Sequence, residues 1–257
     1  MRCSKTLARI RAQQPVRMCV LGHFIPAYVH HAARFGFDCI WLDLEHRLIP
    51  PAQLQTLLAH CHLADIDCML RPPTLEKTGL YRYLEDGATG LMIPHVSTAE
   101  KARTLVDSVK FPPLGDRGLD GAGLDGAYYL DDHAQYVDAA NRETFLVVQI
   151  ETPQAIENVD AIAAVDGVDG MFFGPGDLGM RIKRIPGVEL TLESAQQRVA
   201  DAAARHGKAW GRPASSVEDV QRYYDQGAQL VAYGGEFVTL MRMLQDAATS
   251  LERVYTG

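Results

Sequence analysis

The sequence has only five cysteines in 257 residues, and their spacing indicates no covalent or metal-binding framework. The number is odd and includes no C-x-x-C pair among Cys3, Cys19, Cys39, Cys61 and Cys68. Neither a disulfide scaffold nor a thiolate metal site is therefore indicated, and we interpret these thiols as small buried hydrophobic side chains.

Long hydrophobic runs and blocks of positive charge are also lacking. No stretch stays apolar long enough to span a bilayer, and the basic N-terminal segment MRCSKTLARIRAQQ lacks the apolar region of a signal peptide. The net charge of −7 argues against binding to nucleic acid or to an anionic membrane surface. We expect a cytoplasmic protein whose partners are small molecules.

Short apolar runs rich in β-branched or aromatic residues alternate with segments of helical period, a rhythm typical of parallel βαβ units. Strands are expected at Val16–Leu21, Cys39–Asp43, Cys68–Arg71, Gly90–Pro94, Phe145–Ile150, Gly170–Phe173, Ala209–Gly211 and Leu230–Tyr233. Eight parallel strands in a chain that is 47% hydrophobic predict an α/β fold, a (β/α)₈ TIM barrel forming one domain over residues 1–257.

Helices are expected between these strands and after the last one. They are assigned to Ala27–Phe35, Pro51–Ala64, Thr78–Glu85, Ala99–Ser108, Leu130–Ala140, Pro153–Ala164, Leu192–His206, Val217–Gln226 and Phe237–Arg253. The connection Phe111–Gly126 is unusually long and rich in Gly and Pro, and loops of this length often cover a site or form an oligomer contact.

Polar residues follow the carboxyl ends of the expected strands, where a barrel carries its active site. The exits are Asp43-Leu44-Glu45-His46, Arg71-Pro72-Pro73, Gln149 into Glu151, Gly174-Pro175-Gly176 into Asp177, and Gly234-Gly235-Glu236. Glu151 and Asp177 follow neighbouring strands, so their like charges should meet at one rim. A divalent ion such as Mg²⁺, Mn²⁺ or Co²⁺ would relieve that repulsion, although a solvated pair of carboxylates is the simpler alternative.

Other side chains at the same rim suit carbanion chemistry. Arg71 can stabilise a developing enolate oxygen, or it can form a structural ion pair. His46 has an ordinary pKa suited to proton transfer near neutral pH, and His95 follows the fourth expected strand as a further pocket candidate. The sixth expected strand carries no lysine, so Schiff-base catalysis lacks a candidate and a metal is the expected electron sink.

These residues resemble the HpcH/HpaI aldolase family, the metal-dependent class II pyruvate aldolases that include 4-hydroxy-2-oxoheptanedioate and 2-keto-3-deoxy sugar-acid aldolases. The resemblance runs through most of the chain and depends on the order of several motifs. They are FDCIWLDLEH (37–46), RPP (71–73), LEDGATGLMIPHV (84–96), FPPLGDRG (111–118), QIET (149–152) and GVDGMFFGPGDLG (167–179).

The resemblance implies an enzyme, a carbon–carbon lyase that reversibly cleaves a 4-hydroxy-2-oxo acid to pyruvate, or a related 2-oxo acid, and an aldehyde through a metal-stabilised enolate. It also assigns residue roles. Glu151 and Asp177 would bind the metal, His46 would accept the proton, Arg71 would stabilise the enolate, Glu85 would support His46, and Gln149 with the backbone at Gly176 and Asp177 would bind the 2-oxo acid. Asp43 competes with Glu85 for the role of orienting His46. The family further implies a homo-oligomer, commonly a hexamer, whose last helix packs on a neighbouring subunit.

The sequence departs from the family pattern at several positions. Arg47 and Leu48 stand where a small residue often follows the histidine, and Gly176 replaces the usual alanine of the turn that follows the sixth strand. Three alternatives stay open: a 2-oxo acid decarboxylase or CoA-thioester lyase with the same enolate site, a non-catalytic barrel that only binds, and a sugar-phosphate isomerase, which Glu236 disfavours because it would repel a phosphate.

Overall fold

The computed structural model describes residues 1–130, 132–187 and 189–255, and its strands close into one parallel barrel. The strands are β1 (Met18–Leu21), β2 (Cys39–Asp43), β3 (Asp67–Arg71), β4 (Gly90–Ile93), β5 (Phe145–Ile150), β6 (Gly170–Phe173), β7 (Ala209–Pro213) and β8 (Leu230–Gly235). Each strand pairs in parallel with the next, and β8 pairs with β1. The predicted (β/α)₈ fold is confirmed.

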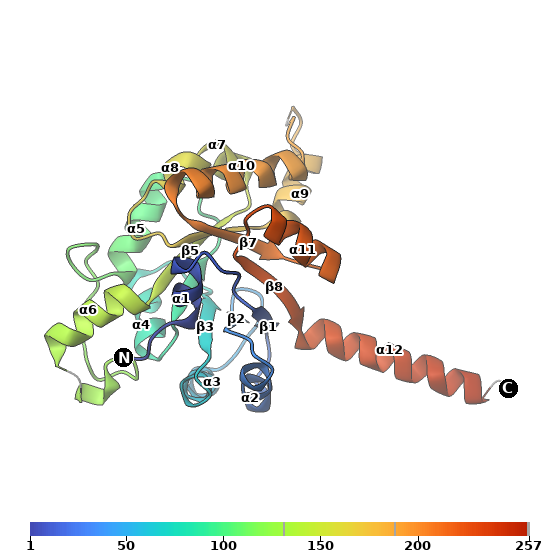
Figure 1. Cartoon of the computed structure of the whole chain (residues 1–257), viewed down its shortest axis with the longest axis horizontal. Helices are drawn as coiled ribbons and strands as arrows, with labels where there is room; N and C mark the ends of the chain where they lie inside the picture. The colour runs from blue at the N-terminus through green and yellow to red at the C-terminus, as the bar shows by residue number, and fades with distance from the viewer. Residues whose placement is uncertain (131, 188, 256–257) are drawn as a thin grey trace.

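Most of the helices surround this barrel on the outside (Figure 1). They are α1 (Lys5–Arg11), α2 (Pro26–Arg34), α3 (Pro51–Leu63), α4 (Lys77–Glu85), α5 (Ala99–Val109), the 3₁₀ turn η1 (Ala127–Tyr129), α6 (His133–Glu143), α7 (Pro153–Glu157), α8 (Val159–Ala163), α9 (Pro175–Arg184), α10 (Leu192–His206), α11 (Val217–Asp225) and α12 (Glu236–Tyr255).

Two helices were not expected from the sequence, and two expected helices differ. The expectation lacked α1 and α9, and the single helix expected at Pro153–Ala164 is divided into α7 and α8 at Asn158. The helix expected at Leu130–Ala140 begins later, at His133, and its position 131 lies outside the described residues.

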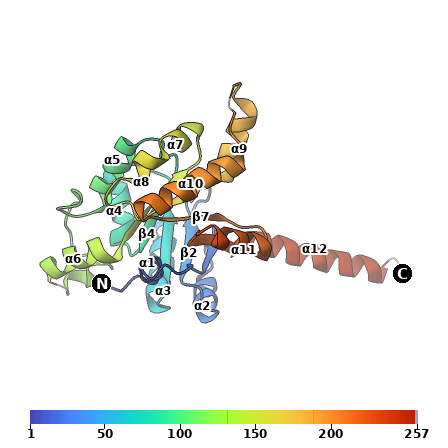
Figure 2. The same ribbon diagram turned by 45° about the horizontal axis from the view of Figure 1, so that its top comes forward.

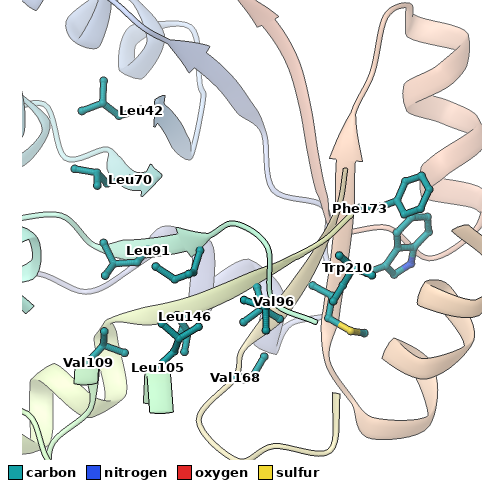
Figure 3. Packing of buried hydrophobic residues seen from close by; sticks show 14 of the residues in the cluster. Leu42, Leu70, Leu91, Val96, Leu105, Val109, Leu146, Val168, Phe173 and Trp210 are labelled. Atoms are coloured by element: carbon teal, nitrogen blue, oxygen red, sulfur yellow. The ribbon is translucent and has the colours of Figure 1, made fainter. Parts of the chain in front are cut away.

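Side chains on the strands alternate between two cores, as the two-residue period of a strand requires. The outward-facing set packs against the helices, and Figure 3 shows Leu42, Leu70, Leu91 and Leu146 from four successive strands in this cluster. The inward-facing set fills the barrel interior. Leu7 of α1 belongs to the interior set, so α1 helps to close the end of the barrel where the strands begin.

The last helix projects away from the barrel (Figures 1 and 2). Every residue of α12, all of them within the described part of the chain, is at least partly exposed, including Phe237, Leu240, Met241 and Leu244. No helix among the described residues combines the length and the apolar composition needed to cross a membrane.

Candidate active site

A cavity of about 310 Å³ opens where the strands end. Its wall comes from the ends of β2, β3, β5, β6 and β7 and from the first turn of α9. Six of the seven site residues expected from the sequence line this cavity: His46, Arg71, Gln149, Glu151, Gly176 and Asp177.

The period of the strands explains why these side chains converge. Along β5, Phe145 and Val147 point into the barrel, so Gln149 and then Glu151 continue on the inner side. Along β2, Cys39 and Trp41 are interior residues, and Asp43 follows with the same period. Asp43 pairs in register with Arg71 of β3, which places these opposite charges side by side.

Arg71 is held rigidly at the inner wall of the cavity. Its Nε and Nη2 donate to Oδ1 and Oδ2 of Asp43 at 2.9 Å each, and its Nη1 lies 2.9 Å from Oε2 of Glu45. The guanidinium also stacks 4.9 Å from the ring centre of Trp41. Burial raises the pKa of Asp43, but the hydrogen bonds and charge of Arg71 outweigh burial and lower it. Arg71 therefore presents a fixed, permanently charged donor.

Glu151, Asp177 and His95 form a compact group of potential metal ligands. Their ligating atoms all lie within 4.8 Å of one another. Glu151 is buried, and its Oε1 accepts the backbone N–H of His95 at 2.7 Å. Burial is the largest effect that raises the pKa of Glu151, and the charges of Asp177 and Glu45 add to it, while His95 opposes it. Glu151 and Asp177, which were expected at one rim, therefore lie close together in the structure.

Gly174 allows the chain to pass close to Glu151. A Cβ atom on Gly174 would lie 2.7 Å from both Cβ and Oε2 of Glu151 and 3.0 Å from Nε2 of Gln149. Gly176 has no such constraint. Apart from its chain neighbours and the backbone of its own helix, no heavy atom of the described residues lies within 4 Å of the position that a Cβ would take. The alanine usual in the family at Gly176 would therefore fit here.

His46 lies at the mouth of the cavity with its side chain 59% exposed. Its Nε2 is 3.5 Å from Oε2 of Glu45, and its backbone N–H donates to Oδ1 of Asp43 at 3.4 Å. Asp43 therefore fixes the loop that carries His46, whereas Glu45 faces its imidazole.

Glu85 is placed away from this cavity. It ends α4, and the chain then runs into the start of β4 at the opposite end of the barrel. The charged groups that influence its carboxyl are Arg117, Asp125, Asp120 and Arg82. Arg117 and Asp125 belong to the long loop, which packs along α4: Gly118 approaches Tyr81 and Gly123 approaches the Glu85 backbone. Among the described residues, neither Glu85 nor this loop lines the cavity.

The structure also assigns contacts to three residues outside the set of expected site residues. Glu45 bridges Arg71, His46 and His95, and its signal was its place two residues after Asp43 on the same strand period. Trp41, two residues before Asp43, forms part of the cavity wall. His95 was a pocket candidate, but its contact with Glu151 depends on a turn with a φ of +55° that the sequence did not indicate.

Similarity to known proteins agrees with this geometry. The model of the HpcH/HpaI aldolase/citrate lyase family matches residues 17–242. A protein of Pseudomonas aeruginosa named hydroxypyruvate/pyruvate aldolase is 36% identical over 236 residues, which cover 89% of this chain and 85% of that protein. An Escherichia coli 5-keto-4-deoxy-D-glucarate aldolase is 33% identical over 222 residues, which cover 85% of each chain.

A solved structure gives the same result for the fold. The HpcH/HpaI aldolase from Desulfitobacterium hafniense superposes with a TM-score of 0.89 at 29% identity, covering 96% of both chains. The fold and the site define a (β/α)₈-barrel protein with an acidic centre at the carboxyl end of its strands. The chain belongs to the HpcH/HpaI aldolase/citrate lyase family, as its motifs indicated.

Proposed function

We propose that the protein is a divalent-metal-dependent aldolase that reversibly cleaves a 4-hydroxy-2-oxo acid to pyruvate, or a related 2-oxo acid, and an aldehyde. The observation that carries the proposal is the pair of carboxylates, Glu151 and Asp177, facing the same cavity as the fixed Arg71. The names of the aldolase relatives from Pseudomonas aeruginosa and Escherichia coli support a small 2-oxo acid as the substrate class.

The acidic centre fits a divalent ion. Two carboxylates that repel each other, with space beside them for a chelating substrate, are a donor set suited to Mg²⁺, Mn²⁺ or Co²⁺. Glu151 and Asp177 would hold the ion. Such an ion, when bound, supplies Lewis acidity that makes the carbon next to a carbonyl group more acidic.

Arg71 and His46 would then act on the substrate. Because Asp43 and Glu45 fix the guanidinium before substrate arrives, Arg71 can stabilise negative charge on the enolate oxygen without reorganisation. His46 would accept the proton of the 4-hydroxyl group during cleavage and return it during aldehyde addition, and its exposure allows exchange with water.

The substrate carboxylate has donors at the start of α9. The first backbone N–H groups of a helix lack partners within the helix and favour anions, and Gly176 and Asp177 occupy this position. Gln149 lines the same cavity and would add its side-chain amide. We propose that these groups orient the 2-oxo acid.

Proton exchange at the methyl group of pyruvate in D₂O, followed by NMR, tests this function without a choice of aldehyde. Chelator-treated protein should be inactive, and added Mn²⁺, Mg²⁺ or Co²⁺ should restore exchange. Arg71→Ala should lower the metal-dependent rate about 100-fold or more, the loss typical for one donor to a developing oxyanion. Folded wild-type protein that supports no exchange with any of these metals would refute a pyruvate aldolase.

We also propose a cytoplasmic homo-oligomer, a hexamer by family resemblance, built from single-domain subunits. Its support is α12, which leaves Phe237, Leu240, Met241 and Leu244 exposed at the spacing of one helix face. In an assembly this face would pack on a neighbouring subunit. All five cysteines are free thiols, which suits a reducing compartment.

A further inference from the structure

His95 places an imidazole within the acidic centre, and the proposed function does not use it. Its Nδ1 lies 2.9 Å from Oε1 of Glu151, and its Nε2 lies 3.4 Å from Oε1 of Glu45. The ring therefore bridges one carboxylate of the proposed metal site and one carboxylate beside Arg71. A proton on Nδ1, or a divalent ion bound to both atoms, would account for this short separation, because a neutral nitrogen lone pair and a carboxylate oxygen repel each other.

The spacing suits two ligands of one ion. Nitrogen and oxygen donors bind small divalent ions at about 2.1 Å, so adjacent donors of an octahedral ion lie about 3.0 Å apart and opposite donors about 4.2 Å apart. The separation of 2.9 Å between His95 Nδ1 and Glu151 Oε1 matches adjacent donors. The ligating atoms of His95, Glu151 and Asp177 all lie within 4.8 Å of one another, so only a small movement of side chains would bring the three into these donor distances.

The backbone holds His95 in a conformation that is costly for most residues. Its φ is +55°, in the left-handed region, where a non-glycine residue loses on the order of 1 kcal/mol. Two contacts stabilise it: its N–H donates to Glu151 at 2.7 Å, and its carbonyl accepts from Nζ of Lys101 at 2.8 Å. The N–H and Nδ1 of His95 thus face the same oxygen of Glu151.

Glu45 is placed to support a ligating imidazole. Histidine ligands usually donate their second ring N–H to a carboxylate, a backbone carbonyl or water, which fixes the tautomer and strengthens the donor nitrogen. Oε1 of Glu45 faces Nε2 of His95, while its Oε2 is fixed by Nη1 of Arg71 at 2.9 Å. A proton on Nε2 leaves the Nδ1 lone pair available on the side of Glu151 and Asp177.

We propose that His95 is a third protein ligand, through Nδ1, of the divalent ion held by Glu151 and Asp177. This inference rests on the proposed metal site and defines it more closely: one nitrogen and two carboxylate ligands instead of two carboxylates alone. Imidazole favours Co²⁺, Ni²⁺, Fe²⁺ and Zn²⁺ over Mg²⁺. The protein should therefore bind these transition ions more selectively than an all-oxygen site.

Pulsed EPR of the full-length protein carrying one equivalent of Mn²⁺ tests the proposal directly. A ligating imidazole gives electron spin-echo modulation from directly bound ¹⁴N. We expect this signal in the wild type, its loss in His95→Gln with Mn²⁺ still bound, and its retention in the matched control His46→Gln. Mn²⁺ bound without ¹⁴N modulation in the wild type would overturn the ligand assignment while leaving the Glu151 and Asp177 site intact.

Other outcomes separate this inference from the proposed function. If the wild type binds no stoichiometric Mn²⁺, the proposed metal site itself fails. If the modulation is lost in His46→Gln and persists in His95→Gln, His46 is the ligand and the proposal is wrong. A wild-type spectrum without ¹⁴N modulation overturns the proposal even if one variant does not fold.

Metal selectivity gives a second readout that does not depend on turnover. Competition titrations should show that His95→Gln weakens Co²⁺ binding by at least roughly 10- to 100-fold, the loss typical when a residue that supports a metal ligand is removed, with a much smaller effect on Mg²⁺. Equal losses for both ions would indicate that His95 only positions Glu151, as an ion pair would, and would refute ligation.

Discussion

Replacing Gly174 by alanine is expected to displace Glu151 and weaken the metal site. The new Cβ would lie 2.7 Å from both Cβ and Oε2 of Glu151, closer than ordinary van der Waals contact allows. The backbone at Gly174 cannot easily retreat, because its N–H donates to the carbonyl of Ile150 at 3.0 Å. Rotation of the side chain cannot move Cβ of Glu151, so the backbone just after β5 must shift and carry the carboxylate with it.

The size of the effect follows from that distance. The contact must lengthen by about 0.7 Å, from 2.7 Å to the 3.4 Å at which ordinary contact begins. Overpacking of this kind costs about 1–3 kcal/mol of unfolding free energy. Shifts near 1 Å in a reacting group can cost about 100-fold in rate. We expect Gly174→Ala to lose that stability and to slow metal-dependent pyruvate exchange by about that factor.

Gly176→Ala is the matched control on the same turn. Its Cβ would meet no heavy atom within 4 Å among the described residues, and Gly176 is not among the glycines with positive φ. Alanine should raise the unfolding free energy by about 0.4–1 kcal/mol, because it restricts the unfolded chain. Urea denaturation and Mn²⁺ titration by EPR measure both variants. Gly174→Ala with wild-type stability and wild-type Mn²⁺ affinity would refute the argument.

Two further predictions concern Glu85 and α12. Burial raises the pKa of Glu85 from 4.5 to about 7, so its contribution to stability is complete below pH 4.5 and is lost as the pH rises through 7. Glu85→Gln should therefore raise the unfolding free energy more at pH 8 than at pH 5 in urea denaturation and leave turnover unchanged; a folded variant without turnover would instead give Glu85 a role in the reaction. On α12, Leu244→Glu should reduce the mass measured by light scattering towards the 28.3 kDa of one chain, whereas Thr249→Glu should not. A wild-type protein that is already monomeric would refute the proposed oligomer.

The barrel could be predicted from the sequence because its strands are short apolar runs separated by helical patterns. All eight expected strands are present, and the differences lie at their ends: β3 begins at Asp67 and β8 extends to Gly235. These extensions add polar or glycine residues, which hydrophobic patterns do not detect. Pairing with a neighbouring strand determines such ends, as in the pairing of Asp67 with Cys39.

The unexpected helices had local signals that were weaker than competing ones. In α9, Gly174-Pro175-Gly176 is typical of a turn, although Pro175 at the first helical position and Lys183 near the end are typical of a helix. In α1, the side chain of Ser4 accepts the N–H of Leu7 and caps a helix of only 7 residues. Short helices of this kind depend on tertiary packing, which a sequence pattern does not contain.

The residues of the candidate site also differ in whether the sequence could place them. Residues that follow a strand by its two-residue period, such as Asp43 and Glu151, could be placed at the rim because the period fixes the side on which they point. Glu85 could not be placed by motif order alone, because its surroundings depend on how the loop containing Arg117 and Asp125 packs along α4.

Glu45 shows why charge at this site cannot be assigned from neighbours in the sequence. One of its oxygens lies 2.9 Å from Arg71 and 3.5 Å from His46, and the other lies 3.4 Å from His95. These partners come from three different strand ends, so the carboxylate couples the group that stabilises the enolate, the proposed proton acceptor and the proposed third metal ligand. A change at any one of them should alter the position of the others through Glu45, and the effects of their substitutions should therefore not be additive.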